Sequence, residues 1–163
     1  MGFKRINFLV LVLAGFASTF SHAYDQKGCM QGIDVVFDVS QRLADANMNL
    51  LSMELAQGSV GNDADNSVVT HLNNGVDVVL EKINSAYTIS ILRQGGNFKQ
   101  TKYIDSIVSL HFKQLFRSVQ NAKERFTKYT GSIKNYKLKM QAFATAQELE
   151  KISLQLAKCE KIE

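Results

Sequence analysis

Proline is absent from all 163 residues of this chain, tryptophan is absent as well, and only two cysteines and three histidines occur. Proline breaks helix interiors, so its absence over such a length favours long, uninterrupted helices. Aromatic residues make up 9% of the chain and charged residues 21%. The hydrophobic content of 45% is enough for one domain of this size to bury a real core.

Sequence motifs that carry chemistry are missing too. The chain contains no His-Glu-x-x-His or Glu-x-x-His metal motif, no Cys-x-x-Cys-His haem attachment motif and no P-loop. It also lacks Gly-x-Gly-x-x-Gly and the Gly-x-Ser-x-Gly elbow of a serine nucleophile. No set of residues has the spacing that acid–base or nucleophilic catalysis needs, so we predict that the protein is not an enzyme.

The N-terminal segment has the layout of a secretory signal peptide. A short basic stretch precedes an apolar run over residues 6–16, and Ser21 and Ala23 are the small residues of a cleavage site. The apolar run is too short to span a bilayer comfortably, and no later segment is apolar enough to do so. We predict a cleaved signal peptide over residues 1–23 and a single domain without a transmembrane segment over residues 24–163. An uncleaved anchor is the alternative.

Cys29 and Cys159 stand near the two ends of the predicted mature chain. In an oxidising compartment such a pair favours a disulfide bond, and two buried thiols are the alternative. The bond would close a loop of about 130 residues and contribute ~4–5 kcal/mol in the chain-entropy model. The chain has no Asn-x-Ser/Thr sequon, which agrees with the periplasmic or secreted bacterial location that we predict.

Apolar residues recur with a helical period through almost the whole mature chain. Glycine-containing breaks at residues 58–63, 95–97 and 130–132 divide it into four segments of about 30 residues. Short connections between such segments predict an all-α fold, an antiparallel up-and-down four-helix bundle. In that topology the N- and C-terminal ends lie at one end of the bundle, where the disulfide would join them.

Each predicted helix has an apolar face, and two of the four have a predicted N-cap. We expect Asp63 or Asp65 to cap the second helix and Ser132 to cap the fourth. The predicted core positions, helix by helix, are Cys29, Ile33, Val36, Phe37, Leu43, Ala44, Met48, Leu51 and Leu55; Val69, Leu72, Val76, Val79, Leu80, Ile83, Tyr87 and Ile91; Ile104, Ile107, Val108, His111, Leu115, Val119, Ala122, Phe126 and Tyr129; and Ile133, Tyr136, Met140, Phe143, Ala144, Gln147, Ile152, Leu156 and Cys159.

The two halves of the mature chain carry opposite charge. Residues 24–94 contain nine acidic and four basic residues, a net charge of −5, whereas residues 95–163 contain six acidic and thirteen basic residues, a net charge of +7. The basic charge gathers, with two tyrosines, at the predicted end of the bundle away from the cysteines. This basic–aromatic cluster consists of Lys123, Arg125, Lys128, Lys134, Lys137, Lys139, Tyr129 and Tyr136.

We interpret the basic–aromatic cluster as a docking surface for an acidic partner protein, with anionic glycans or lipid headgroups as less favoured ligands. The structural alternative is a solvated basic face that pairs with Asp63 and Asp65. Export and the modest net charge of +4 argue against nucleic acid as the partner. A homo-oligomer is compatible with the sequence.

His71 and His111 are the two histidines of the predicted mature chain. We expect His111 to be a core histidine with one satisfied hydrogen bond. His71 is predicted to lie toward the basic end with Met48, Met53 and Met140, and methionine with histidine holds haem in some periplasmic bundles. The predicted architecture resembles the cytochrome b562 proteins in compartment, length class and helix count, although no ligand motif carries that resemblance.

Methionines are also common fillers of apolar cores, so we predict no cofactor. A bundle that binds haem, copper or another metal through His71 or His111 with methionine is kept as an alternative. The function that we predict is that of a non-enzymatic exported protein that binds a partner protein, such as an inhibitor or immunity protein or an adaptor of envelope or secretion machinery. A secreted virulence factor is a further alternative.

Overall fold

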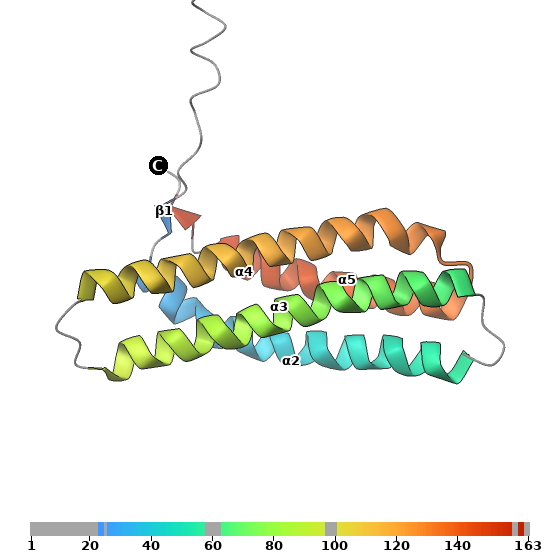
Figure 1. The fold of residues 1–163 in the computed structure, drawn as a ribbon, viewed down its shortest axis with the longest axis horizontal. Helices are drawn as coiled ribbons and strands as arrows, with labels where there is room; N and C mark the ends of the chain where they lie inside the picture. Colours follow the sequence, from blue (N-terminus) through green and yellow to red (C-terminus); the bar gives the residue numbers. More distant parts are fainter. Residues whose placement is uncertain (1–22, 25, 58–62, 97–100, 158–159, 162–163) are drawn as a thin grey trace, which may run out of the picture.

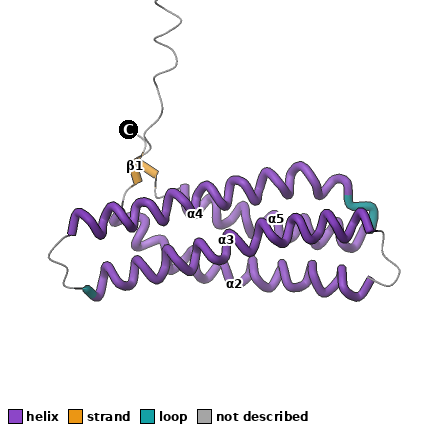
Figure 2. The backbone as a smooth tube through the Cα atoms, viewed as in Figure 1, coloured by secondary structure: helices purple, strands orange, loops and turns teal. Residues whose placement is uncertain are grey.

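The computed structural model of the chain describes residues 23–24, 26–57, 63–96, 101–157 and 160–161. The predicted signal peptide up to residue 22, Cys159 and the side chain of Cys29 lie outside the described residues. Four helices account for nearly all of the described chain, with a short 3-10 turn, η1, before the last of them (Figure 2). They are α2 (Gln26–Gln57), α3 (Asp63–Gly95), α4 (Thr101–Tyr129) and α5 (Tyr136–Ala157), and η1 spans Thr130–Ser132.

The four helices form an all-α bundle, as the sequence predicts. Consecutive helices run in opposite directions (Figure 1). Each helix packs against two neighbours: α2 and α4 both contact α3 and α5. None of the described helices combines the length and the hydropathy that a bilayer-spanning helix needs.

Two short strands, which the sequence analysis did not predict, flank the bundle. Strand β1 (Ala23–Tyr24) pairs antiparallel with β2 (Glu160–Lys161), with Ala23 opposite Lys161 and Tyr24 opposite Glu160. The pair lies beside the helices, away from the connection between α4 and α5 (Figure 1). Backbone before the first helix is therefore hydrogen-bonded to backbone after the last one.

The core of the bundle is aliphatic with two large aromatic rings. Phe112 and Phe126 of α4 are its largest fully buried side chains. A polar bridge, in which the Asn47 side chain donates to Asn73 Oδ1, joins α2 and α3, and Asn47 itself is buried. The apolar residues buried around these groups are Val36, Val39, Leu43, Leu50, Val69, Leu72, Val76, Val79, Ile83, Ala86, Val108, Leu115, Val119, Ala122, Ile133, Leu138, Ala142, Leu149, Ile152 and Leu156.

The predicted core faces are correct for most of α3 and α4 and wrong for parts of α2 and α5. In α2, Met48 is 60% and Leu55 79% exposed, because the buried face instead follows Leu43, Asn47 and Leu50. In α4, Phe112, which follows His111 in the sequence and was not among the predicted core residues, lies in the core.

Helix α5 has two apolar faces, and the core residues predicted for it are divided between them: Tyr136, Met140, Phe143 and Gln147 lie on the outer face, whereas Ile152 and Leu156 lie on the inner, buried face. Tyr136 is 73%, Met140 49% and Phe143 47% exposed, and Gln147 is exposed as well. The inner face carries Leu138, Ala142, Thr145, Leu149 and Ile152, all of them buried.

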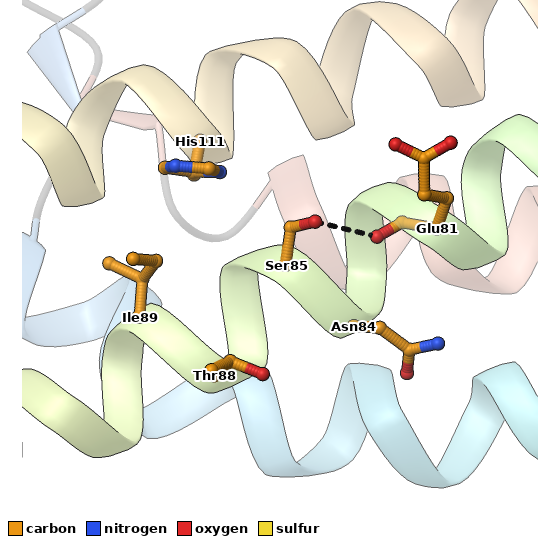
Figure 3. A pocket seen from close by; sticks show the side chains of 6 residues that line it. All are labelled: Glu81, Asn84, Ser85, Thr88, Ile89 and His111. Atoms are coloured by element: carbon orange, nitrogen blue, oxygen red, sulfur yellow. Dashed lines mark hydrogen bonds between the residues drawn. The ribbon is translucent and has the colours of Figure 1, made fainter.

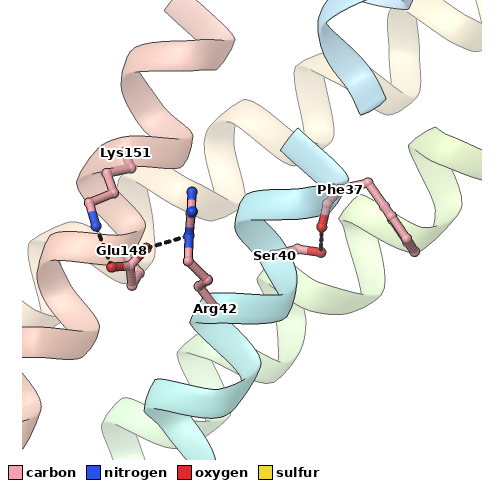
Figure 4. A network of polar contacts seen from close by, with 5 residues as sticks. All are labelled: Phe37, Ser40, Arg42, Glu148 and Lys151. Carbon is pink, nitrogen blue, oxygen red and sulfur yellow. Dashed lines mark hydrogen bonds and ion pairs between the residues drawn. The ribbon is translucent and has the colours of Figure 1, made fainter. Parts of the chain in front are cut away.

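Polar contacts between side chains fasten α2 to α5 (Figure 4). Arg42 Nε lies 3.6 Å from Glu148 Oε2, and the ammonium group of Lys151 also binds Glu148. One turn further along α2, the carbonyl oxygen of Ala46 accepts a hydrogen bond of 2.9 Å from the Gln141 side chain. These contacts place the inner face of α5 against α2 and leave its outer face toward solvent.

Candidate protein-interaction surface

The basic–aromatic cluster is built around the connection from α4 through η1 to α5. Asp65 of α3, which is 4% exposed, accepts two backbone hydrogen bonds there. The Lys134 N–H donates to Oδ1 and the Asn135 N–H to Oδ2, each over 2.9 Å. Ile133, just before this pair, is buried in the core. The segment that carries the lysines is therefore anchored to the start of α3.

The predicted helix caps are corrected by this geometry. Asn135, not Ser132, caps α5, because its Oδ1 accepts the Leu138 N–H over 3.2 Å. Ser132 instead donates to the carbonyl oxygen of Tyr129 over 2.7 Å. The Asp65 carboxylate, which belongs to α3, binds the backbone just before α5. Among the described residues it pairs with these backbone N–H groups and not with a lysine ammonium group.

Three lysines of the cluster follow one another along this anchored segment. Lys134 and Lys137 are exposed and Lys139 is half-buried. Within the described part of the chain, none of the three ammonium groups has an ion pair or a hydrogen bond. Tyr136 lies among them with 73% of its surface exposed. An exposed aromatic ring and two cations, Lys137 and Lys139, thus occupy the first turns of α5, a third, Lys134, lies just before the helix, and none of the three cations has a partner among the described residues.

At the neighbouring end of α4, the lysine of the cluster contacts an aromatic ring. Lys128 Nζ lies 5.0 Å from the ring centroid of Tyr129, a cation–π distance. The Tyr129 ring is half-buried, and His71 of α3 packs edge-on against it with centroids 5.0 Å apart. The structure therefore brings His71 beside the basic–aromatic cluster.

Lys123 and Arg125 serve the packing of the bundle. Lys123 Nζ pairs with Glu150 Oε2 over 2.6 Å and lies 3.2 Å from Ser153 Oγ, both on α5. The side chain of Arg125 lies against Gly75 of α3, where an added Cβ would be 3.4 Å from Arg125 Cδ. Because both side chains are half-buried and contact other helices, the exposed charge of the cluster that has no described partner is concentrated on Lys134 and Lys137, with the half-buried Lys139 in the same segment.

His111 lines a shallow cavity between α3 and α4 (Figure 3). The cavity measures about 420 Å³, and its other lining residues come from α3: Glu81, Asn84, Ser85, Thr88 and Ile89. His111 Nδ1 is buried and has no hydrogen-bond partner among the described residues, so the expectation of a satisfied core histidine is wrong for this atom. The Ser85 hydroxyl donates within its own helix, to the carbonyl oxygen of Glu81, over 2.9 Å.

Most of the residues considered for haem are exposed at the surface, and only Met53 packs against the core. Met48 and Met140 are 60% and 49% exposed, His71 is exposed, and Met53 packs against the core. The described residues also contain no group of three or more histidine, cysteine or acidic side chains arranged to hold a metal ion.

Comparison of the chain with protein-family models, curated proteins and solved structures finds no match. A functional interpretation therefore depends on the basic–aromatic cluster.

Proposed function

We propose that the protein is a non-enzymatic, exported helical protein that binds an acidic partner protein through the basic–aromatic cluster. The observation that carries this proposal is that Lys134, Lys137 and Lys139 lie in one short segment with the exposed Tyr136. These cations have no partner within the described chain, and they are held on a segment that the Asp65 carboxylate anchors.

The position of the lysines supports a role in binding rather than in stability. Cations near the start of a helix are disfavoured by its dipole, by roughly 0.3–1 kcal/mol each where they are exposed. No acidic residue lies in the first turn of α5 to offset them. Lysines that lower the stability of the free protein, and that have no acidic partner among the described residues, are expected where the partner is another molecule.

Export and the disulfide belong to the same proposal. A signal peptide over residues 1–23 would deliver the protein to the periplasm or the medium, where a bond between Cys29 and Cys159 can form. The pairing of β1 with β2 supports this bond, because it holds the backbone before the first helix next to the backbone after the last helix. The paired residues are close in sequence to Cys29 and to Cys159. Within this class, an inhibitor or immunity protein, an envelope adaptor and a secreted virulence factor all remain candidate roles.

The test is to replace Lys134, Lys137 and Lys139 with glutamine and to measure how much native partner the protein captures from envelope and culture-medium fractions. A matched control replaces Lys102, Lys113 and Arg117, which are exposed elsewhere on α4, with the same loss of charge. We expect capture to fall at least about tenfold for the first variant and to stay unchanged for the control. Equal capture by both variants would contradict the docking surface.

A further inference from the structure

The outer face of α5 carries a second, regular pattern of residues. Its exposed positions follow one another at alternating spacings of four and three, the spacing of the a and d positions of a coiled-coil seam. From Tyr136 to Leu154 these positions span about 27 Å of the helix at 1.5 Å per residue. We call these residues the outer seam: Tyr136, Met140, Phe143, Gln147, Glu150 and Leu154, all of them exposed.

The residues that flank the outer seam also fit a helical partner. Lys137 and Lys139 occupy the e and g positions beside its first turns, where charges select the partner helix in a coiled coil. Ala144 and Ala146 occupy the same flanks one heptad later, and such small side chains allow a second helix to approach closely. The positions between the flanks, Leu138, Thr145 and Ile152, are buried in the bundle.

We propose that the outer seam binds one amphipathic helix of the partner protein, with apolar a and d residues and acidic e and g residues. This inference rests on the proposed function and deepens it, because it names the kind of segment that the basic–aromatic cluster recognises. The apolar side chains of the partner would pack on Met140 and Phe143, and its carboxylates would face Lys137 and Lys139. Charge complementarity along the seam therefore selects the partner.

Two other occupants fit the outer seam less well. A second copy of the chain would place its Lys137 and Lys139 near the same two lysines of the first copy. Like charges at these flanks oppose pairing. A lipid surface would bury the amide of Gln147 without a hydrogen-bond partner and would remove the Lys123–Glu150 ion pair from water, both of which are costly. A partner helix can supply a hydrogen-bond partner to Gln147.

The direct test uses two synthetic peptides of three heptads, both with leucine at a and d, and with either glutamate or lysine at e and g. The like charges keep each peptide from pairing with itself. Binding of each labelled peptide to the purified protein is measured by fluorescence anisotropy. We expect the glutamate peptide to bind at least about tenfold more tightly than the lysine peptide, and its affinity to fall as salt is added. Equal binding of the two peptides would overturn the inference.

Variants separate the seam from its flanks. Met140→Ser with Phe143→Ser is expected to abolish binding of the glutamate peptide, whereas the control Met48→Ser with Leu55→Ser, which changes two exposed apolar residues of α2, is expected to leave it unchanged. Lys137→Glu with Lys139→Glu is expected to reverse the preference, so that the lysine peptide binds more tightly. A reversal cannot arise from unfolding. A seam variant that binds like the unchanged protein would overturn the inference.

The remaining outcomes distinguish this inference from the proposed function. If the lysine-to-glutamine variant loses its native partner but the seam variant retains it, the proposed function stands and the seam fails. If both variants retain the partner, both fail. Two results would overturn the inference when neither peptide binds. Binding to vesicles of phosphatidylglycerol that the seam variant abolishes would assign the seam to lipid. Dimerisation in sedimentation that the seam variant abolishes would assign it to a second copy of the chain.

Discussion

The carboxylate of Asp65 accepts a hydrogen bond from the backbone N–H of Lys134, a residue 69 positions further along the chain. Its second oxygen accepts the N–H of Asn135. Backbone groups at the end of one connection are thereby satisfied by a side chain from a different helix. The relationship fixes the position of the lysines that follow, and it accounts for a buried carboxylate that has no ammonium partner among the described residues.

Replacement of Asp65 with asparagine should destabilise the protein by about 1–3 kcal/mol, because one of two charge-assisted acceptors becomes an N–H donor that faces another N–H. Urea unfolding followed by circular dichroism measures this loss. Asp63→Asn is the control: Asp63 is exposed in the same first turn, so only its interaction with the helix dipole, a few tenths of a kcal/mol, is at stake. Equal losses in the two variants would speak against the anchoring role of Asp65.

The two faces of α5 should respond differently to truncation. Leu149 is fully buried, so Leu149→Ala is expected to cost about 2–5 kcal/mol. Phe143 is 47% exposed, and Phe143→Ala is expected to cost less than about 1 kcal/mol despite removing the larger side chain. Thermal or urea unfolding of both variants compares them directly. A greater loss for Phe143→Ala would mean that the outer face packs within the bundle.

Gly75→Ala should stabilise the protein by about 0.5–1 kcal/mol. Glycine in a helix interior is unfavourable relative to alanine, and Gly75 lies well inside α3. The added Cβ would lie 3.4 Å from Arg125 Cδ and 3.8 Å from the Cβ of Ala122, which are ordinary contact distances. A rise in the melting temperature is the expected readout. A fall would show that the close approach of Arg125 requires glycine.

The cysteines should form one intramolecular disulfide in the exported protein. Mass spectrometry of the purified protein should then find two hydrogens fewer than in the reduced form. Reduction, or Cys29→Ser with Cys159→Ser, should lower the free energy of unfolding by ~4–5 kcal/mol if the chain-entropy model holds. Two free thiols that react with a maleimide under native, non-reducing conditions would contradict this prediction.

The sequence predicts the helices of this protein better than it predicts their orientation. Each helix ends at the glycine-containing break expected for it: α2 before Gly58, α3 at Gly95, and α4 before the turn that contains Gly131. In α3 the apolar residues gather mainly on one face, so Val69, Leu72 and Val76 were assigned to the core correctly. In α5 two apolar faces compete, and periodicity alone does not tell which one meets the other helices.

The geometry of the candidate site was less predictable for a related reason. Composition and helix order place Lys134, Lys137 and Tyr136 near one end of the bundle. They do not show that Lys123 pairs with Glu150 or that Asp65 binds backbone across the bundle, because these are contacts between helices distant in sequence. The helical pattern of Tyr136, Met140, Phe143 and Gln147 is visible in the sequence, where it predicts core positions, whereas the structure exposes all four.

The pairing of β1 with β2 has a practical consequence for how the molecule is presented. Both strands lie beside the bundle, away from the connection between α4 and α5 that carries the lysines (Figure 1). A tether attached just before Ala23 or just after Lys161 would leave from the same place. Protein immobilised by such a tether would hold the basic–aromatic cluster outward, so either attachment suits an assay in which the partner is supplied from solution.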